Sequence, residues 1–268
     1  MLNKKIAILG GGNLGLSIAE GLIKSKLFNP ENICVKKRKV QLIEHLKKQK
    51  ILVTKNNKNA ISISDVIIIA VKPKQLNSLL KEIKPSLKPQ KHLLISTVTG
   101  VSLEEIQSII GKTIILFRAM PNTAISIQQS MTCISNNNAN EDQKQYVLSI
   151  FDQLGKSIII EDELMGSATV LGACGIAYSM RFIRAASQGG IEIGFDSDIA
   201  QFIAAQTVKG AASLLLETGR HPEQEIDRVT TPQGCTIAGL NEMEHQGFSS
   251  ALIRGVLTSY RKVLKITE

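Results

Sequence analysis

A glycine-rich turn that directly follows a short apolar run constrains the fold of this chain more than any other feature. Residues 6–9 are Ile-Ala-Ile-Leu, and Gly-Gly-Gly-Asn-Leu-Gly occupies 10–15, at the start of an amphipathic stretch that extends to residue 27. A strand that runs into G-x-G-x-x-G and then into a helix presents unpaired backbone amides to a pyrophosphate. A glycine triplet also forms plain turns, but the strand before it and the helix after it favour a dinucleotide site.

Each glycine of this pattern has its own physical role. Gly10 permits the tight turn, Gly12 lets the backbone approach the pyrophosphate, and Gly15 lets the helix pack closely on the strand. Asn13 and Leu14 complete the loop. We therefore expect these five residues to form the phosphate end of a cofactor site.

Strand-like and helix-like segments alternate along the first 160 residues. The run 66–71 is continuously apolar, which is typical of a parallel strand buried on both faces. Strand–helix–strand units at this spacing form right-handed parallel sheets. The expected strands are 4–9, 33–35, 66–71, 93–96, 113–117, 130–135 and 157–160, and the expected helices are 13–27, 40–50, 73–83, 103–110 and 141–154. The Asn- and Lys-rich piece 55–59 is expected to be a loop.

The remainder of the chain has the pattern of a helical domain. Helices are expected over 163–194, 196–219, from 222 onward and over 248–264. Its apolar surface is large for about 100 residues, which suggests burial against a second chain. The predicted fold class is α/β, with an N-terminal Rossmann-like parallel sheet over 1–161 and an all-helical dimerisation and substrate domain over 162–268.

Composition and charge narrow the classes of partner. The chain is 43% hydrophobic and 21% charged, which excludes a disordered chain. Residues 1–100 hold 19 Lys and Arg against 5 Asp and Glu, whereas the rest holds 13 against 18. A basic half fits a nucleic acid or a phosphorylated ligand, and scattered lysines are also ordinary on a solvated surface. Aromatic residues make up 4% and Trp is absent, so nucleic acid is not expected.

The cellular compartment and the absence of a metal are predicted from the lengths of the apolar runs and from the spacing of the cysteines. The longest aliphatic run, 66–71, is far shorter than the ~20 residues of a spanning helix, and residues 6–9 are too few for a secretory segment. Neither a membrane segment nor a leader is expected. The cysteines show no C-x-x-C pair and no metal-ligand spacing, which favours a cytoplasmic protein without a metal. These cysteines are Cys34, Cys133, Cys174 and Cys235.

The residues after the second expected strand indicate which dinucleotide binds. NAD sites carry Asp or Glu there for the ribose 2′-hydroxyl, but this chain has Lys36, Lys37, Arg38 and Lys39. The planar guanidinium of Arg38 suits a 2′-phosphate, and Lys36 or Lys37 adds charge. The alternative is a solvated lysine run. The pattern favours NADP(H), with NAD(H) left open.

Several ordered motifs resemble those of the pyrroline-5-carboxylate reductase family, over nearly the whole chain. The glycine loop is similar to G-x-G-N-M, AVKP at 70–73 matches a turn of the family, and RAMPNT at 118–123 matches R-x-M-P-N-T. The stretch 227–240 resembles D-x-V-T/S-S/T-P-G-G-T/A-T-I-x-x-L, and Ala-Leu-Ile at 251–253 continues the similarity.

The resemblance implies a Rossmann domain and a helical domain that interlocks with its twin in a dimer or a larger homo-oligomer. It implies NAD(P)H-dependent reduction of 1-pyrroline-5-carboxylate to L-proline, the last step of proline synthesis. Thr236 would act in catalysis, with its hydroxyl on the ring nitrogen or a water bound to it. The implied cofactor residues are Gly10, Gly12, Asn13, Leu14, Gly15, Lys36, Lys37, Arg38, Asn57, Ala70, Val71, Lys72 and Pro73. The implied substrate residues are Met120, Pro121, Asn122, Gly175, Thr231, Gly234, Cys235 and Thr236.

The chemistry of a cyclic imine agrees with this residue set. Such an imine is readily protonated and then accepts hydride without a metal or strong acid, so the protein mainly orients the reactants. None of the four histidines lies in a motif typical of a general acid, and each is expected at the surface or in a cap. Lys72 is expected on the cofactor side only.

Two segments depart from the family pattern. S-G-S-G-P-A-Y is replaced by GACGIAY at 172–178, and P-G-G-[TA]-T by PQGCT at 232–236. Gln233 stands where glycine is usual, and Cys235 is either a buried filler or a group near the substrate. The alternatives are a paralogous NADPH-dependent reductase of another imine or keto acid, and a cofactor-binding regulatory protein with little turnover. Oligomeric state beyond a dimer and feedback by proline stay open.

Overall fold

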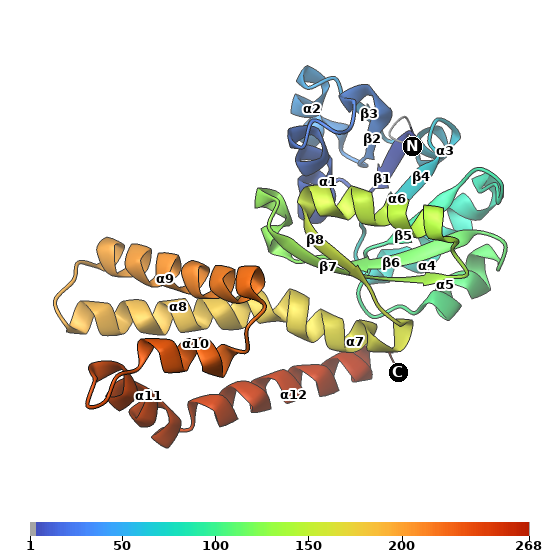
Figure 1. Ribbon diagram of the computed structural model, residues 1–268. Coiled ribbons are helices and arrows are strands. Elements are labelled where there is room, and N and C mark those ends of the chain that lie inside the picture. The colour runs from blue at the N-terminus through green and yellow to red at the C-terminus, as the bar shows by residue number, and fades with distance from the viewer. Residues whose placement is uncertain (1–3, 268) are drawn as a thin grey trace. The chain divides into compact units, whose positions relative to one another are not determined.

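The computed structural model describes residues 4–267 and divides into two compact bodies (Figure 1). The first body extends to Cys174 and takes in the chain again from Tyr260 onward. The second body is Gly175–Ser259. Each body is described by itself.

The first body is built on one eight-stranded sheet with the order β3-β2-β1-β4-β5-β6-β7-β8. Every neighbouring pair is parallel except β6 and β7, which are antiparallel. This confirms the predicted α/β class with a mostly parallel N-terminal sheet. The strands are β1 Ile6–Leu9, β2 Ile33–Lys36, β3 Leu52–Thr54, β4 Val66–Ile69, β5 Leu93–Ser96, β6 Ile115–Met120, β7 Ser130–Asn137 and β8 Gly155–Ile159.

Helices cover both faces of this sheet, because its central strands are apolar on both sides (Figure 1). Ile6 and Ile8 of β1 pack with helices α1 and α6, whereas Ala7 and Leu9 pack with α3, α4 and α5. All four side chains have no exposed area. The helices of this body are α1 Asn13–Lys24, α2 His45–Lys48, α3 Asn57–Ser62, α4 Pro73–Ile83, α5 Leu103–Ile110, α6 Glu141–Phe151 and α7 Met165–Ala168.

Three local predictions in this body are wrong. The segment 40–50 is not one helix but a 3-10 turn, Val40–Ile43, followed by the short α2. The piece 55–59 is not all loop, since Asn56 accepts hydrogen bonds from the amides of Lys58 and Asn59 and caps α3. The three-residue strand β3 was not expected, because it is too short to show an alternating pattern.

The reversal between β6 and β7 follows from the length of their connection. Only residues 121–129 join the two strands, and they include the 3-10 helix Thr123–Ile127. A parallel crossover needs a dozen or more residues, so the chain turns back and pairs antiparallel.

The expected single helix over 163–194 is interrupted. Its first turn, Asp162–Leu164, is 3-10, and a π-helix covers Thr169–Cys174 between α7 and α8. The Thr169 hydroxyl donates to the Met165 carbonyl at 2.8 Å, and the Asn122 side chain donates to the Gly172 carbonyl at 3.1 Å. Side chains that donate hydrogen bonds to helix carbonyls compete with the regular backbone hydrogen bonds of an α-helix. Single π-helical turns occur often at functional sites.

The second body is entirely helical over its described length. It contains α8 Gly175–Glu192, α9 Ser197–Thr218, α10 Pro222–Val229, α11 Cys235–His245 and the first part of α12 Phe248–Thr267. Many large apolar side chains of this body are exposed, such as Leu216 at 84% and Phe202 at 71%. By length and composition alone, α9 could cross a membrane, and 6% of its apolar window is buried within the described chain. Its apolar residues are interrupted by polar ones, so it contains no long uninterrupted aliphatic run.

His92 makes the stability of the first body depend on pH. The Nδ1 of this side chain accepts a hydrogen bond from the Lys88 amide at 2.9 Å, so His92 caps a turn. It is only 3% exposed and is therefore buried rather than at the surface. Burial, together with the charges of Lys91 and Lys88, lowers the pKa of His92. The folded protein therefore favours the neutral ring, whereas the unfolded chain protonates near pH ~6.5.

We predict that the free energy of unfolding is fully retained above pH ~6.5 and falls below it, by at most about 1.4 kcal/mol per pH unit from this group, until the lowered pKa is passed. Urea unfolding of the wild type and of His92→Gln between pH 7.5 and 5 measures this. Gln keeps an acceptor for the Lys88 amide without a charge, so its pH dependence should be shallower. Equal slopes in the two proteins would contradict the assignment. The exposed His45→Gln serves as the control.

Candidate active site

The turn between β1 and α1 is one that only glycine can form. Gly10 has φ of 131°, and a Cβ at this position would collide with the carbonyl of Ala70 at the end of β4. A Cβ on Gly15 would collide with the Gly10 carbonyl. Both residues therefore have the tight-turn and close-packing roles that the pattern predicts.

Gly12 has a different environment, since nothing lies within 4 Å of the place where its Cβ would be. It is the N-cap of α1, no side chain caps this terminus, and the first turn holds no acidic residue. The amides of that turn thus keep their partial positive charge for a ligand in the open space. This arrangement fits the pyrophosphate of a dinucleotide.

A cavity of about 640 Å³ lies in front of this turn. It includes most of the predicted cofactor residues, but Asn13, Leu14, Gly15 and Pro73 lie in the first turns of α1 and α4 and do not line it. The predicted residues in its wall are Gly10, Gly12, Lys36, Lys37, Arg38, Asn57, Ala70, Val71 and Lys72.

The wall also contains residues that sequence reasoning missed. Gln75, Ser78 and Glu82 come from α4 at helical spacing after the Ala70–Pro73 turn, and Leu42 follows β2. Leu76, Leu80 and Ile83 of α4 are fully buried. A helical projection of 73–83 would have shown that the polar side chains form the opposite stripe, next to the cofactor turn.

The electrostatics of the cavity are strongly positive. Five of the residues in its wall are cationic, and Glu82 is the single carboxylate among the described residues that line it. Burial lowers the pKa of Lys36, the nearby charge of Glu82 opposes this shift, and Arg38 adds to it. A phosphate placed here would be attracted by several cations at once.

Met120, Pro121 and Asn122 lie at the end of β6, beside the π-helix. The Met120 sulfur accepts a hydrogen bond from the Thr99 hydroxyl at 3.7 Å. Asn122 accepts from the Ala124 amide and donates to the Gly172 carbonyl, so its amide ties this turn to the π-helix. The structure thus brings these three predicted residues next to segment 169–174, within the first body.

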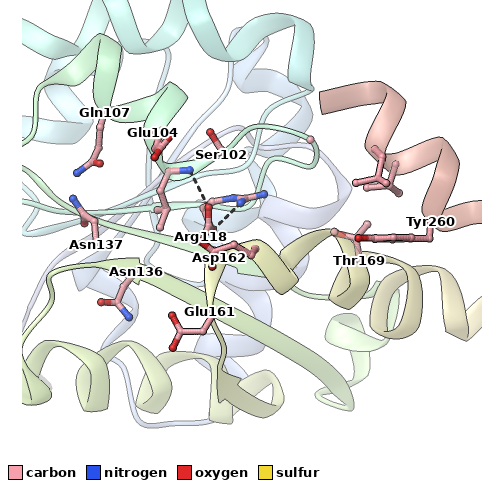
Figure 2. Close-up of a pocket in the computed structure, with 16 residues that line it drawn as sticks. Ser102, Glu104, Gln107, Arg118, Asn136, Asn137, Glu161, Asp162, Thr169 and Tyr260 are labelled. Carbon is pink, nitrogen blue, oxygen red and sulfur yellow. Dashed lines mark hydrogen bonds and ion pairs between the residues drawn. The ribbon is translucent and has the colours of Figure 1, made fainter. Parts of the chain in front are cut away.

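A buried ion pair holds the same strand to the start of the helical segment (Figure 2). Arg118 is 7% exposed, and its Nη1 donates to Asp162 Oδ1 at 2.7 Å. The Ser135 hydroxyl donates to the same oxygen, and the Leu103 amide donates to Oδ2 at 3.3 Å. Loss of one partner of such a pair costs ~3–5 kcal/mol. The matched motif at 118–123 contained Arg118, but its structural role could not be derived from the motif.

This pair lies in the wall of a second cavity, of about 520 Å³. Glu104 and Glu161, both labelled in Figure 2, also line this cavity, and none of the predicted cofactor or substrate residues lines it. Among the described residues, no group of three or more His, Cys, Asp or Glu side chains could hold a metal ion.

The predicted substrate loop lies in the second body and forms a tight turn. The Gly234 amide donates to the Thr231 carbonyl at 2.9 Å, and Gln233 has φ of 60°. Gln233 thus adopts the left-handed conformation that glycine accepts at lower cost, in the position where the family has glycine. Cys235 is exposed, so it is no buried filler within this chain.

This loop leads into α11 as the glycine turn leads into α1. Gly234 is the N-cap, no side chain caps it, and a Cβ there would meet Thr231 Oγ1 at 2.5 Å. Thr236, in the first turn of α11, is exposed. Gly175, the first residue of α8, is half-buried in the same body. Amides at such a terminus can bind a carboxylate.

Two family models match the chain. The model described as pyrroline-5-carboxylate reductase dimerisation matches 162–266, and that of NADP oxidoreductase coenzyme F420-dependent matches 5–100.

Full-length sequence relatives are found in several organisms. Pyrroline-5-carboxylate reductase 2 of Dictyostelium discoideum is 43% identical, over 98% of this chain and 93% of that protein. Pyrroline-5-carboxylate reductase of Synechocystis is 36% identical, over 96% of each. Pyrroline-5-carboxylate reductase 1 of Dictyostelium discoideum is 50% identical over 97% of this chain, which spans 49% of that longer protein.

Solved structures share the architecture. Pyrroline carboxylate reductase of Plasmodium falciparum with NADP bound has a TM-score of 0.89 at 26% identity, over all of both chains. A pyrroline-5-carboxylate reductase from Coxiella burnetii has a TM-score of 0.93 at 28% identity, over 99% of each chain.

We predict that Gly12→Ala weakens NADPH binding at least ~10-fold while it lowers the free energy of unfolding by less than about 1 kcal/mol, because its methyl group fills only the open space. Gly10→Ala should instead destabilise the fold, since its Cβ meets the Ala70 carbonyl. Isothermal titration with NADPH and thermal unfolding separate the two effects. Gly166→Ala, the same addition in α7, is the control. Normal NADPH affinity in Gly12→Ala would show that the phosphates do not lie over this turn.

Proposed function

Because the chain belongs to the pyrroline-5-carboxylate reductase family, we propose that it reduces 1-pyrroline-5-carboxylate to L-proline, with NADPH as the hydride donor. The chain is an NAD(P)H-dependent oxidoreductase of this family. One observation in the structure supports the proposal most directly. The open, uncapped start of α1 at Gly12 faces a cavity wall rich in cations.

The first body supplies the residues that would hold the cofactor. The amides after Gly12 bind the pyrophosphate, and Arg38 with Lys36 or Lys37 binds the 2′-phosphate. Asn57 contacts the adenosine end, and the Ala70–Pro73 turn lies along the nicotinamide. When bound, the reduced nicotinamide supplies a hydride to the imine carbon of the substrate.

The substrate is held by groups that bind its carboxylate and orient its ring. The amides at the start of α11, from Gly234 through Thr236, bind the carboxylate, and the Thr236 hydroxyl bonds to the ring nitrogen or its water. Thr231 and Cys235 border this loop. The family resemblance also assigns Met120, Pro121, Asn122 and Gly175 to substrate binding.

The chain's part in the reaction is mainly orientation. A protonated cyclic imine is already electrophilic, so no strong acid, metal or covalent intermediate is required. None of the four histidines is among the proposed site residues. Holding the ring at a fixed distance and angle supplies most of the acceleration in such a transfer.

The partner of the helical body is a second copy of the chain. The dimerisation model over 162–266 and the exposed apolar side chains of α8, α9, α11 and α12 support a homo-oligomer. We propose a dimer or a larger assembly of dimers. The four free cysteines fit a reducing compartment, and we propose the cytoplasm.

Gln233 favours one second candidate, reduction of a different cyclic imine, because its side chain projects from the substrate loop where the family has glycine. An assay with NADPH or NADH and pyrroline-5-carboxylate tests both. Rapid loss of reduced-nicotinamide absorbance with formation of proline supports the proposal. Cofactor binding without turnover of this imine would refute it and leave another imine, or a regulatory role, to be tested.

We predict that Arg38→Asp weakens NADPH binding about 30- to 100-fold and leaves NADH binding within about threefold of the wild type. Arg38 pairs with the 2′-phosphate that NADH lacks, and charged hydrogen bonds contribute ~1.5–3 kcal/mol. Dissociation constants from fluorescence titration with each nucleotide measure the ratio. Lys112→Asp, the same change of charge at an exposed position outside the cavity, should affect neither. Equal losses for the two nucleotides would remove Arg38 from the 2′-phosphate site.

We predict that Thr236→Val lowers kcat for the imine at least ~10-fold with little change in the Kd for NADPH, since only the hydroxyl is lost. Thr236→Ser keeps a hydroxyl and should restore most of the turnover. Steady-state kinetics at saturating NADPH, with a separate NADPH titration, provide both values. Wild-type turnover in Thr236→Val would exclude the hydroxyl from the reaction.

A further inference from the structure

The wall of the cofactor cavity contains a buried amide whose oxygen has no partner in the described chain. Asn57, the first residue of α3, is 3% exposed. Its Nδ2 donates to Glu82 Oε1 at 2.9 Å, while its Oδ1 is buried and accepts no hydrogen bond. An unpaired buried acceptor destabilises a fold unless another molecule supplies the donor. Because Asn57 lines the cavity, the donor is expected on the molecule that fills it.

Glu82 determines how this amide is turned. An ionised carboxylate only accepts hydrogen bonds, so the amide nitrogen of Asn57 must face it and the oxygen must face away. Glu82 itself is exposed, whereas Leu80 and Ile83 of the same helix are fully buried. Its contact with Asn57 is therefore not a by-product of core packing.

Charge alone would give Glu82 an unfavourable role in this cavity. It is the one carboxylate among the described residues of a wall that otherwise carries Lys36, Lys37, Arg38, Lys39 and Lys72. Its charge helps to keep the partly buried Lys36 protonated, since it opposes the effect of burial on the pKa of Lys36. It also repels the phosphates of a nucleotide, so its charge has opposing effects on the site and does not by itself explain a carboxylate at this position.

We propose that Glu82 is a positioning residue of the cofactor site, which turns the Asn57 amide so that its Oδ1 accepts a hydrogen bond from the adenosine half of the dinucleotide. The adenine amino group and the ribose hydroxyls are donors of that half. This inference rests on the proposed function, because it assigns the cavity to NADPH.

Glu82 would weaken nucleotide binding by repelling the phosphates and strengthen it by positioning the Asn57 amide. Because these two effects on affinity are opposite, one substitution separates them. Glu82→Gln removes the negative charge and lets the Asn57 amide turn either way. Repulsion alone predicts that a phosphorylated nucleotide binds this variant more tightly. Positioning predicts that it binds about tenfold more weakly, the usual effect of one lost hydrogen bond.

The test measures the two halves of the cofactor separately, by calorimetric titration with 2′,5′-ADP, reduced nicotinamide mononucleotide and NADPH. For Glu82→Gln we expect about tenfold weaker binding of 2′,5′-ADP and NADPH, and unchanged binding of the mononucleotide. The KM for NADPH should rise by the same factor, while kcat at saturating NADPH stays within about twofold. Glu82→Asp keeps the charge on a shorter side chain and should show a smaller loss. Lys81→Ala, next to it on α4, is the control.

A double-mutant cycle shows whether Glu82 acts through Asn57. Asn57→Ala should weaken 2′,5′-ADP, and adding Glu82→Gln to it should cause no further loss. Three outcomes would each overturn the inference and leave the proposed function intact. They are unchanged or tighter binding of 2′,5′-ADP to Glu82→Gln, an equal loss of affinity for the mononucleotide, and full additivity of the two substitutions in the cycle. If the wild type binds neither NADPH nor 2′,5′-ADP, the inference about Glu82 and the proposed function both fail. Thermal unfolding of each variant confirms that the fold is retained.

Discussion

The close approach of the β1–α1 turn to the end of β4 is the constraint on which the first body depends. A side chain at Gly10 would meet the Ala70 carbonyl, and one at Gly15 would meet the Gly10 carbonyl. With neither present, α1 begins directly at the ends of β1 and β4, and no side chain caps its first amides. The same approach places Val71 and Lys72 in one cavity with Gly12. One backbone contact therefore joins the phosphate end of the site to the turn that we assign to the nicotinamide.

Position, rather than number, decides which charges of this basic half take part in binding. Most of the 19 Lys and Arg in residues 1–100 lie on surfaces where water and salt screen them beyond ~10 Å. The cations of the cavity wall act at short range and on one ligand, where a pair of charges 4 Å apart is worth about 4 kcal/mol at an effective dielectric constant of ~20. Net charge alone is equally compatible with nucleic acid, and it is the geometry of Lys36–Lys39 around the glycine turn that favours a phosphorylated dinucleotide.

Sequence reasoning reached the features that local pattern determines and missed those that tertiary contacts determine. The buried strand β4 and the glycine turn are each determined by the sequence of a few adjacent residues, so both were predicted. The π-helical break at Thr169–Cys174 accepts a hydrogen bond at the Gly172 carbonyl from the Asn122 amide, which is 50 residues away in the sequence. Glu82 likewise lines the cofactor cavity with Asn57, which lies 25 residues before it in the sequence and donates a hydrogen bond to it. The three donors that converge on Asp162, from Leu103 at the start of α5, Arg118 in β6 and Ser135 in β7, meet only in the folded chain.

The apolar surface of the second body has two physical explanations, and the sequence of α9 decides between them. This helix is long and apolar enough to span a bilayer, but it carries Gln206 and Lys209 near its middle and Asp198 and Glu217 near its ends. A lysine at the centre of a bilayer costs ~2.5–3.5 kcal/mol, and neighbouring polar groups add to this cost. At an interface between protein chains, the lysine stem can cover apolar surface while its ammonium reaches water. The match of 162–266 to a dimerisation model agrees with the second explanation. The exposed apolar side chains of α9 therefore fit an interface between protein chains better than the interior of a bilayer.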